Sequence, residues 1–336
     1  MMMDNVTRKA QKAVVDDVAP TALTISIPPR KTLSRSNGIT ISYVEWSTNE
    51  KIKRKETAED RISKNQTAEE RTPLLLLHGM ADHALVWCSL GSSLPQNYYV
   101  VAPDLRGHGE SSKPDTGYGF ADTIDDLEAL MAELGWSSAH VLAHSWSAKM
   151  AAVWARRSSE RFRSLILIDP ALIGTFPRWT KVLFPVYYKL LPFLKMLGPF
   201  KDKAAAIAQA KQLKQYQTWS ALQQMVFEHA VEEKADGTWG SKFAIGAREP
   251  MFMDVMTVPG FTKPIDIPTL LVYMTKGINT SERQIKPYKQ YLTHLELCQL
   301  ESNHWAFLVD PELFAEAVTT FLEKQTKRHS GGTIAA

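Results

Sequence analysis

The sequence predicts an α/β fold with a mostly parallel central sheet, flanked by helices and interrupted by a helical insertion. Short apolar runs such as 73–79 and 98–104 end in polar residues or glycine, as strands buried on both faces of a parallel sheet do. Helical patterns separate these runs, and that alternation is typical of α/β proteins. The alternation stops between Pro170 and about Phe261, where helical patterns continue without a convincing strand.

The composition excludes several classes of protein. The 336 residues are 44% hydrophobic and 22% charged, with a net charge of +3, which argues against a disordered chain and against a nucleic-acid partner. No apolar run approaches the roughly 18 residues that a transmembrane helix needs, so we expect no stable membrane insertion. Cys88 and Cys298 lack metal-ligand spacing, so we expect no metal and no other cofactor. The oligomeric state does not follow from the sequence.

The first segment, 1–36, is expected to be a flexible N-terminal tail. It mixes Asp4, Asp16 and Asp17 with basic residues and lacks the apolar stretch of a secretory signal, so we expect a cytoplasmic protein. The stretch PPRKTLSRS at 28–36 is rich in basic residues and serine. Organelle import by the N-terminal tail therefore stays an alternative.

The first part of the predicted core spans 37–170. Its opening strand at 39–46 alternates and is rich in β-branched and aromatic residues, and the Asn37-Gly38 pair before it is a turn signal. From 47 to 72 the sequence changes to Lys, Arg, Glu, Thr and Asn with almost no apolar residues. Such a stretch cannot pack, so it predicts a mobile charged insert.

Further strands and helices complete this part of the core. Apolar residues recur at the spacing that places one stripe on a helix, at Ile124, Leu127, Met131 and Leu134. Strands are predicted at 139–144 and 164–170, and a helix that starts at Trp146 separates them. After the insertion, the second part of the core is predicted at 263–325 and the flexible C-terminal tail at 326–336.

The insertion at 171–262 is predicted to be a helical cap. It contains more aromatic residues than a thin helical layer needs for its own packing. Some of these rings should therefore face a pocket. The rings expected to bind a substrate are those of Trp179, Phe184, Trp219 and Phe227.

Five motifs carry a family resemblance: LLLLHGM at 74–80, VAPDLRGHGESSKP at 101–114, VLAHSWSA at 141–148, LILIDPA at 165–171 and ESNHWAFLVDP at 301–311. Together they resemble the α/β-hydrolase superfamily, and within it the cap-bearing serine hydrolases that include esterases, C–C hydrolases and haloperoxidase-like enzymes. The resemblance covers about residues 37–325. It implies the α/β-hydrolase fold with a helical cap inserted after the sixth strand, a nucleophile, a late histidine and a ligand pocket under the cap.

Ser145 is the candidate nucleophile because it lies between a predicted strand and a predicted helix. A tight turn at this place, the nucleophile elbow, strains the backbone and exposes the turning side chain above the sheet. The family normally has glycine two residues before and two residues after the nucleophile, where this chain has Ala143 and Ser147. Both side chains are small, so we expect the elbow to form with slight strain.

His304 is the candidate general base. It follows the last predicted strand, at 295–300, and it comes after Ser145 as the family order of nucleophile, acid and histidine requires. His78, His108 and His144 are the rival histidines, and each is expected to have a structural role in its own loop.

The triad acid is the least regular part of the pattern. A carboxylate is needed to orient the histidine, and family members commonly carry it at a position where this chain has Gly277. Asp169, which ends the strand after the nucleophile, is the expected substitute. Glu301 and Asn279 stay as alternatives.

The oxyanion hole is expected to consist of two backbone N–H groups, those of Met80 and Trp146. The resulting hypothesis is a serine hydrolase that acts on a carboxylic ester, or a related acyl substrate, with an apolar acyl or aromatic group through an acyl-enzyme. An Asp-nucleophile epoxide hydrolase or dehalogenase is disfavoured because position 145 is Ser. Two alternatives stay open: a C–C bond hydrolase of the same fold, and a non-catalytic ligand-binding receptor on a hydrolase scaffold.

Overall fold

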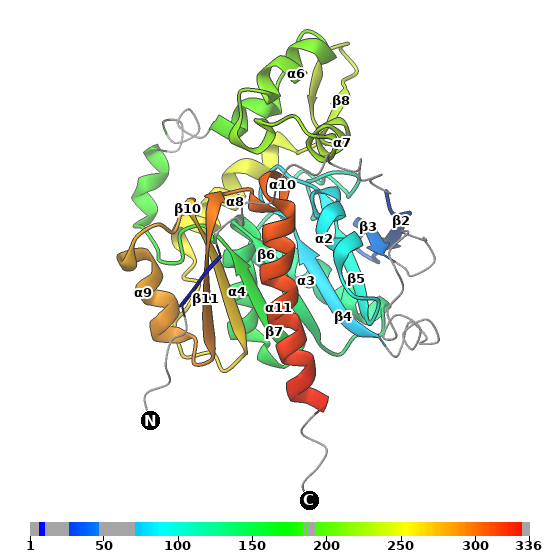
Figure 1. Ribbon diagram of the computed structural model, residues 1–336. Helices are drawn as coiled ribbons and strands as arrows, with labels where there is room; N and C mark the ends of the chain where they lie inside the picture. The colour runs from blue at the N-terminus through cyan, green and yellow to red at the C-terminus, as the bar shows by residue number, and fades with distance from the viewer. Residues whose placement is uncertain (1–6, 11–26, 47–70, 184–185, 187–191, 331–336) are drawn as a thin grey trace, which may run out of the picture.

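Nine strands form one central sheet in the described part of the chain, in the order β1-β11-β10-β7-β6-β4-β5-β3-β2 (Figure 1). The computed structural model describes residues 7–10, 27–46, 71–183, 186 and 192–330. β3 is antiparallel to both of its neighbours, and every other pair is parallel. The strands are β1 (Thr7–Ala10), β2 (Arg30–Ser34), β3 (Thr40–Trp46), β4 (Thr72–Leu77), β5 (Tyr98–Pro103), β6 (Ala139–His144), β7 (Phe162–Ile168), β10 (Thr269–Lys276) and β11 (Leu295–Asn303).

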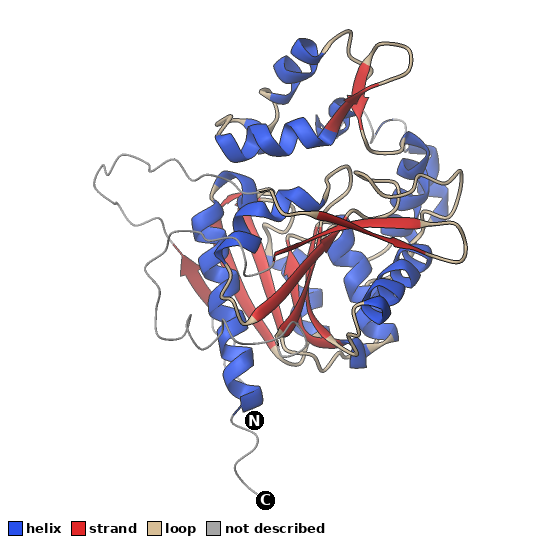
Figure 2. Ribbon diagram, turned by 90° about the vertical axis from the view of Figure 1, so that its right-hand side faces the viewer, coloured by secondary structure: helices blue, strands red, loops and turns tan. Residues whose placement is uncertain are grey.

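Helices cover both faces of this sheet (Figure 2). Leu75 and Leu77 of β4 pack in one apolar cluster with residues of α3, α4 and α9, whereas Leu74 and Leu76 pack in a second cluster with residues of α2 and α11. Side chains alternate between the faces of a strand, so one continuous apolar run supplies both cores. The helices are η2 (Ala84–Trp87), α2 (Cys88–Ser93), α3 (Phe120–Glu133), α4 (Trp146–Arg157), η3 (Ser159–Arg161), α9 (Glu282–Tyr291), α10 (Ala306–Val309) and α11 (Pro311–Ser330).

The strand register brings four strand ends to one edge of the sheet. His144 at the end of β6 pairs with Ile168 of β7, and Ile168 also pairs with Val272 of β10. Lys276 at the end of β10 pairs in turn with Asn303 of β11. The residues that directly follow these four strands therefore lie together at the carboxyl edge, where ligands of open α/β sheets bind.

The cap sits over this carboxyl edge and follows β7, the sixth strand counted from β2 (Figures 1 and 2). Its core is largely helical, and its contacts with the sheet domain include those between η6 and α10 and between α7 and η2. Its elements are η4 (Arg178–Leu183), η5 (Pro192–Leu197), α6 (Lys203–Ala210), η6 (Lys214–Tyr216), α7 (Ala221–Ala230), β8 (Val231–Glu233), β9 (Trp239–Ser241), η7 (Ile245–Ala247) and α8 (Arg248–Thr257).

The cap differs from the sequence prediction in one respect, because it contains a β-hairpin. β8 and β9 pair antiparallel, and backbone hydrogen bonds of 2.7 and 2.8 Å join Phe200 to Trp239. Each strand is three residues long, which is too short to show the period-two alternation on which strand prediction depends. The turn that joins them includes Gly237, whose φ of 81° favours glycine.

The predicted tails also need correction. Thr7–Ala10 adds to the sheet as β1 beside β11, and Arg30–Ser34 pairs with β3 as β2, although both lie within the segment 1–36 that was expected to be a flexible tail. Backbone hydrogen bonds to a sheet edge require no apolar pattern, which explains why the sequence TRKA carries no strand signal. At the other end, α11 extends to Ser330, past the predicted boundary at residue 325.

Most of the predicted mobile charged insert at 47–72 lies outside the described residues, since the description resumes at Arg71 and β4 begins at Thr72. Among the helices of the described ranges, none has the length and apolar character that crossing a membrane requires.

A buried lysine joins α4 to both ends of the cap. Lys149 is fully buried one turn after Ser145, and its Nζ donates hydrogen bonds to the carbonyl oxygens of Gly174, at 2.7 Å, and Val255. Gly174 precedes the cap helices and Val255 lies in the last one. Burial lowers the pKa of Lys149 to about 7, and the nearby Asp254 opposes this shift only in part.

We expect Lys149 to make folding stability depend on pH. Because its pKa is about 7 in the folded protein and 10.5 for an ordinary solvated lysine, the unfolded chain holds one more proton between these values. The contribution of Lys149 to the free energy of unfolding should therefore rise with pH in this window, by about 1.4 kcal/mol per pH unit, and stay constant below it. Urea unfolding of the wild type and Lys149→Met at several pH values measures this contribution as their difference.

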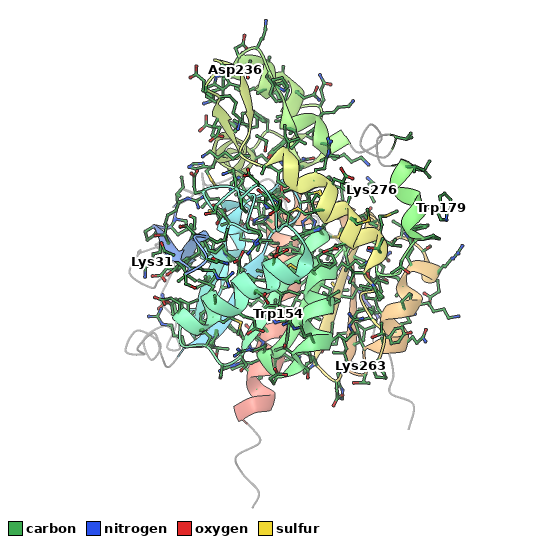
Figure 3. All side chains as sticks on the ribbon, turned by 180° about the vertical axis from the view of Figure 1, so that it is seen from behind. Lys31, Trp154, Trp179, Asp236, Lys263 and Lys276 are labelled. Carbon is green, nitrogen blue, oxygen red and sulfur yellow. The ribbon has the colours of Figure 1, made fainter. Side chains whose placement is uncertain are left out.

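The matched control removes an exposed lysine. Lys263 lies at the surface (Figure 3), and Lys263→Met should unfold with the same pH dependence as the wild type. If the difference in the free energy of unfolding between the wild type and Lys149→Met stays constant from pH 7 upward, Lys149 keeps its proton in the folded protein and the expected pH dependence is wrong.

Candidate active site

Ser145 occupies a strained turn between β6 and α4. Its backbone angles are φ 55° and ψ −111°, and a positive φ is uncommon for a residue other than glycine. Two backbone hydrogen bonds hold the turn, from Ser145 N–H to the Ile168 carbonyl and from Ala171 N–H to the Ser145 carbonyl, both at 2.9 Å. The sequence therefore folds here into the geometry of a nucleophile elbow.

Ser147 explains how the elbow forms without its second glycine. Its hydroxyl lies 3.0 Å from the carbonyl oxygens of both Leu77 and His144, so it can donate to either one. It also accepts a hydrogen bond from the His144 N–H at 3.1 Å. Ser147 thus ties the elbow to the end of β4. At the first glycine position, Ala143 is fully buried and packs in the apolar cluster beneath α4.

His304 and Asp169 come together at the same edge of the sheet. Asp169 follows β7 and is completely buried, and His304 follows β11 with 13% of its side chain exposed. The Asp169 Oδ2 atom lies 2.7 Å from His304 Nδ1. In the neutral histidine, Nδ1 then carries the proton and donates it to this bond, which leaves the lone pair on Nε2.

The segment after β10 holds the other side of the Asp169 carboxylate. The backbone N–H of Ile278 donates to Oδ2 at 2.7 Å, and the backbone N–H and side-chain amide of Asn279 each donate to Oδ1 at 3.0 Å. Burial by itself would raise the pKa of Asp169. The hydrogen bond and charge of His304, together with the hydrogen bonds from Asn279 and Ile278, outweigh burial, so the pKa is lowered.

Glu301 and Asn279, the two alternative candidates for the triad acid, do not take the position of Asp169 beside His304. Asn279 holds the carboxylate of Asp169 and does not itself contact His304 through a hydrogen bond among those of the described residues. Glu301 is exposed on β11. The role of Asn279 as a donor to the acid has no signal in the sequence, because its effect depends on a contact between residues 110 positions apart.

Gly277 makes room for the Asp169 carboxylate. A Cβ atom at position 277 would lie 2.2 Å from Asp169 Oδ2 and 2.8 Å from its carboxyl carbon, closer than real contacts allow. The position at which the family commonly carries its acid is therefore filled here by a carboxylate that comes from the end of β7. Any side chain at 277 would displace it.

The backbone N–H groups of Met80 and Trp146 are the expected oxyanion donors. Trp146 is the first residue of α4, so its N–H has no acceptor within the helix. Met80 lies in the loop after β4, and in the described part of the chain neither N–H donates to a protein acceptor. His78 braces the Met80 loop, because its Nε2 accepts from the Leu105 N–H at 3.0 Å and its Nδ1 lies 2.8 Å from the Gly79 carbonyl. Burial lowers the pKa of His78 to about 4, so it is neutral.

His144 supports His304 from behind. Its Nε2 lies 3.0 Å from the His304 carbonyl, which can only accept, so Nε2 carries the proton. The two rings are 4.4 Å apart between centroids. Burial and the neighbouring His304 lower the pKa of His144 well below its usual value, and this histidine is therefore a neutral structural residue.

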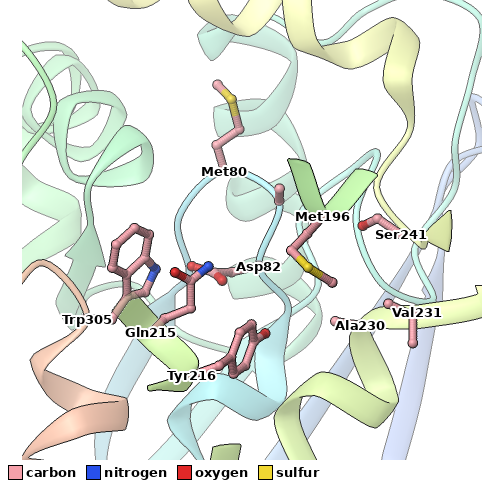
Figure 4. Close-up of a pocket in the computed structure, with 10 residues that line it drawn as sticks. Met80, Asp82, Met196, Gln215, Tyr216, Ala230, Val231, Ser241 and Trp305 are labelled. Carbon is pink, nitrogen blue, oxygen red and sulfur yellow. The ribbon is translucent and has the colours of Figure 1, made fainter. Parts of the chain in front are cut away.

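A pocket opens between the Met80 loop and the cap (Figure 4). Met80 and Trp305, the latter directly after His304, lie on the side of the pocket that is next to the candidate catalytic residues. Its wall combines apolar and polar side chains, which are those of Met80, Ala81, Asp82, Met196, Gln215, Tyr216, Ala230, Val231, Ser241 and Trp305.

The aromatic residues expected to bind substrate do not form the wall of this pocket. Trp219 and Phe227 pack against each other and against Tyr216, with ring centroids 5.4 to 6.2 Å apart, and Phe227 is fully buried whereas Trp219 is half-buried. Trp179 is 66% exposed on the outer surface (Figure 3), and Phe184 lies outside the described residues. Trp219 and Phe227 thus pack on other aromatic rings of the cap, and the expectation that they line this pocket was wrong.

Comparison with known proteins gives matches to a family model, to curated proteins and to solved structures. A family model described as the alpha/beta hydrolase fold matches residues 72–311. Among curated proteins, a soluble epoxide hydrolase of Corynebacterium sp. (strain C12) is 34% identical over 109 residues, which are 32% of this chain and 38% of that protein. A serine hydrolase-like protein of Danio rerio is 24% identical over 273 residues, 76% of this chain and 82% of that one. The chain spans about two fifths of the length of the first curated relatives that it matches.

Solved structures agree on the architecture. The thioesterase domain from the curacin biosynthetic pathway superposes with a TM-score of 0.66 at 20% identity, covering 88% of this chain and 100% of that one. E-2-(acetamidomethylene)succinate hydrolase gives a TM-score of 0.66 at 19% identity, covering 88% and 99%. Identities this low establish the fold only. With the family model matching 72–311, well over half of the chain, this protein belongs to the α/β hydrolase family.

Proposed function

We propose that this protein is a serine hydrolase that cleaves carboxylic esters through an acyl-enzyme, with Ser145, His304 and Asp169 as its catalytic triad. The observation that carries the proposal is the buried Asp169 carboxylate 2.7 Å from His304 Nδ1, at the same sheet edge as the strained Ser145. This pairing supplies an oriented base at the sheet edge where the half-buried Ser145 turns, and acyl transfer requires such a base beside its nucleophile.

In the first half of the reaction, the Ser145 hydroxyl oxygen attacks the ester carbonyl carbon while His304 Nε2 takes its proton. The carbonyl oxygen becomes negatively charged and accepts hydrogen bonds from the N–H groups of Met80 and Trp146. When the tetrahedral intermediate collapses, the bond to the alcohol oxygen breaks and His304 returns the proton to that oxygen. The alcohol leaves, and the acyl group stays esterified to Ser145.

In the second half, water replaces Ser145 as the nucleophile. His304 Nε2 takes a proton from the water as its oxygen attacks the acyl carbon, and the same two N–H groups receive the negative oxygen. Collapse breaks the bond to Ser145, and the proton on His304 passes to the serine oxygen. The products are the carboxylic acid and the free enzyme.

Asp169 acts on both halves by stabilising charge on His304. Its lowered pKa keeps the carboxylate ionised at neutral pH, so it can stabilise the imidazolium that forms each time His304 holds a second proton. Asn279 and Ile278 keep the carboxylate in the orientation that holds the histidine proton on Nδ1. These two residues thereby determine which ring nitrogen serves as the base.

The identity of residue 145 separates this proposal from other reactions named among the relatives. A soluble epoxide hydrolase and a haloalkane dehalogenase both match part of the chain. Residue 145 is Ser here, whereas those reactions in this fold would use a carboxylate nucleophile. A serine oxygen suits acyl transfer, since its acyl product is itself an ester that water can hydrolyse.

The apolar part of the pocket favours an apolar acyl body next to the scissile carbonyl. Met80, Met196 and Val231 contribute to its wall. Burial of each methylene contributes about 0.8 kcal/mol, so two additional methylenes correspond to roughly a tenfold gain in kcat/KM. We therefore propose that the substrates are esters of short apolar acids.

We expect a fluorophosphonate probe to label the wild type at one serine and to leave Ser145→Ala unlabelled. Activated serine hydroxyls react with such probes, whereas an ordinary serine at a helix start does not. Mass spectrometry of the labelled peptide, together with turnover of phenyl esters, measures this. A protein that is neither labelled nor active toward esters would be a ligand-binding receptor on a hydrolase scaffold, and the proposed function would be wrong.

We expect Asp169→Asn to keep the fold and to lower kcat for ester hydrolysis by several orders of magnitude, about 10⁴ by analogy with the serine proteases. Asparagine can hold the wrong histidine tautomer and does not stabilise the imidazolium. The measurement is kcat by stopped-flow or steady-state assay, with circular dichroism as the test of folding. Turnover within about tenfold of the wild type would assign the acid to another residue.

Gly277→Ala tests the same carboxylate without changing a polar group. Its methyl group would fall 2.2 Å from Asp169 Oδ2, so we expect the carboxylate to shift and kcat to drop by about 10². Gly246→Ala is the matched control, because a Cβ there meets no atom within 4 Å. Equal activity of the two variants would contradict the placement of the carboxylate.

We expect kcat/KM to increase by roughly tenfold from phenyl acetate to phenyl butanoate, for the reason of methylene burial given above. The values are corrected for spontaneous hydrolysis measured with Ser145→Ala. A flat or falling series would contradict an apolar acyl site and would leave the role of Ser145 untouched.

A further inference from the structure

We propose that the pocket beside the active site binds an ammonium group carried by the ester substrate, with the Asp82 carboxylate as its counter-charge. The proposal rests on the proposed function, since it names the class of ester that this site takes. It changes the expected substrate from a purely apolar ester to an apolar ester with a cationic end.

Asp82 is held at the base of the pocket by its own loop. Ala81 before it has a φ of 62°, in the left-handed region, and the Asp82 N–H donates to the Gly79 carbonyl at 3.3 Å. Only 11% of the Asp82 side chain is exposed. The turn that carries Met80, the proposed oxyanion donor, therefore also carries this carboxylate two residues later.

The carboxylate has no cationic partner within the described part of the chain. Among the described residues no lysine or arginine forms an ion pair with Asp82, and the side chain of Trp305 donates a hydrogen bond to it. The nearest histidine atom is His144 Nδ1, 3.8 Å from Oδ2, which is beyond hydrogen-bond distance. His144 is neutral and carries its proton on the opposite nitrogen, so it cannot balance the charge.

An unbalanced carboxylate in this position is costly, and a bound cation would remove the cost. Burial raises the pKa of Asp82 to about 7, and the hydrogen bond from Trp305 opposes the rise only in part. Close to neutral pH the group is thus poised between its two forms. A positive group in the pocket would favour the ionised form and would gain a charge-assisted hydrogen bond.

The rest of the pocket fits an ammonium group. The rings of Tyr216 and Trp305 border it, and aromatic faces attract cations when water is excluded. Figure 4 shows the Gln215 amide and the Trp305 indole turned toward Asp82. Gln215 is buried, and its amide oxygen can accept a further N–H. Among the described residues, no basic side chain lines the pocket, so nothing in that wall repels a cation.

The position of the pocket defines where the ammonium must be on the substrate. Met80 supplies both a wall of the pocket and a proposed oxyanion donor, and Trp305 directly follows the proposed base His304. A carbonyl bound at the elbow therefore has the pocket next to it. A short acyl chain of two or three carbons, with the ammonium at its end, would reach Asp82.

The experiment compares two phenyl esters that differ in charge and little in shape. Phenyl 3-aminopropanoate carries a terminal ammonium where phenyl butanoate carries a methyl group. Each kcat/KM is divided by the rate of hydroxide-catalysed hydrolysis of the same ester, which removes the effect of the ammonium on carbonyl reactivity. We expect the normalised ratio of cationic to neutral ester to be at least about tenfold in the wild type and close to one in Asp82→Asn.

Asp236→Asn is the matched control for the lost negative charge. Asp236 is exposed at the tip of the cap hairpin (Figure 3), and its removal should leave the ratio as in the wild type. The ratio should also rise from about pH 6 to about pH 8, as Asp82 ionises. Of the groups that face Asp82, His144 and Tyr216 stay uncharged in this range, and any change in catalysis that is common to both esters cancels in the ratio.

Calorimetry separates this proposal from the proposed function. In Ser145→Ala, which cannot form the acyl-enzyme, the cationic ester should bind with a dissociation constant about tenfold lower than that of the neutral ester. This holds whether or not the wild type turns over esters. A normalised ratio near or below one in the wild type, a ratio that Asp82→Asn leaves unchanged, or equal binding of the two esters would each overturn the cation site.

Discussion

The hydrogen bond between Asp169 and His304 is the constraint on which the rest of the site depends. A carboxylate with no exposed surface must have its charge balanced by hydrogen-bond donors, and here a histidine, an asparagine and a backbone N–H supply them. Those donors come from the segments that follow β10 and β11. Because every donor is directed at one carboxylate, the position of His304 is determined by the same contacts that stabilise the buried charge.

The sheet supplies the framework for this convergence. β6, β7, β10 and β11 are neighbours in the sheet, and their parallel register aligns the residues that follow each strand. Ser145, Asp169, Gly277 and His304 therefore meet although up to 159 positions of sequence separate them. Gly277 connects the backbone to the site directly, because its missing side chain leaves the volume that the Asp169 carboxylate occupies.

The cap and the Met80 loop together line the pocket beside this site. Lys149 ties α4, the helix that follows Ser145, to both ends of the cap. The same loop that offers the Met80 N–H carries Asp82, which links the expected oxyanion hole to the proposed cation site. The proposed oxyanion donor and the proposed cation site thus share one short turn between β4 and η2, which the neutral His78 stabilises.

The amino-acid sequence by itself determined the α/β architecture, the positions of most core strands along the chain and the turn at Ser145, because these features depend on local apolar patterns and on residues adjacent in the chain. It also indicated Asp169 and His304 as the candidates that the structure brings within 2.7 Å. Only the tertiary structure shows which groups donate to Asp169 and that the absence of a side chain at Gly277 makes room for its carboxylate. Only the tertiary structure also shows β1 and β2 at the sheet edges and the packing of Trp219 against Phe227. Each of these depends on contacts between distant segments, and no local pattern in a single sequence records which distant segments meet.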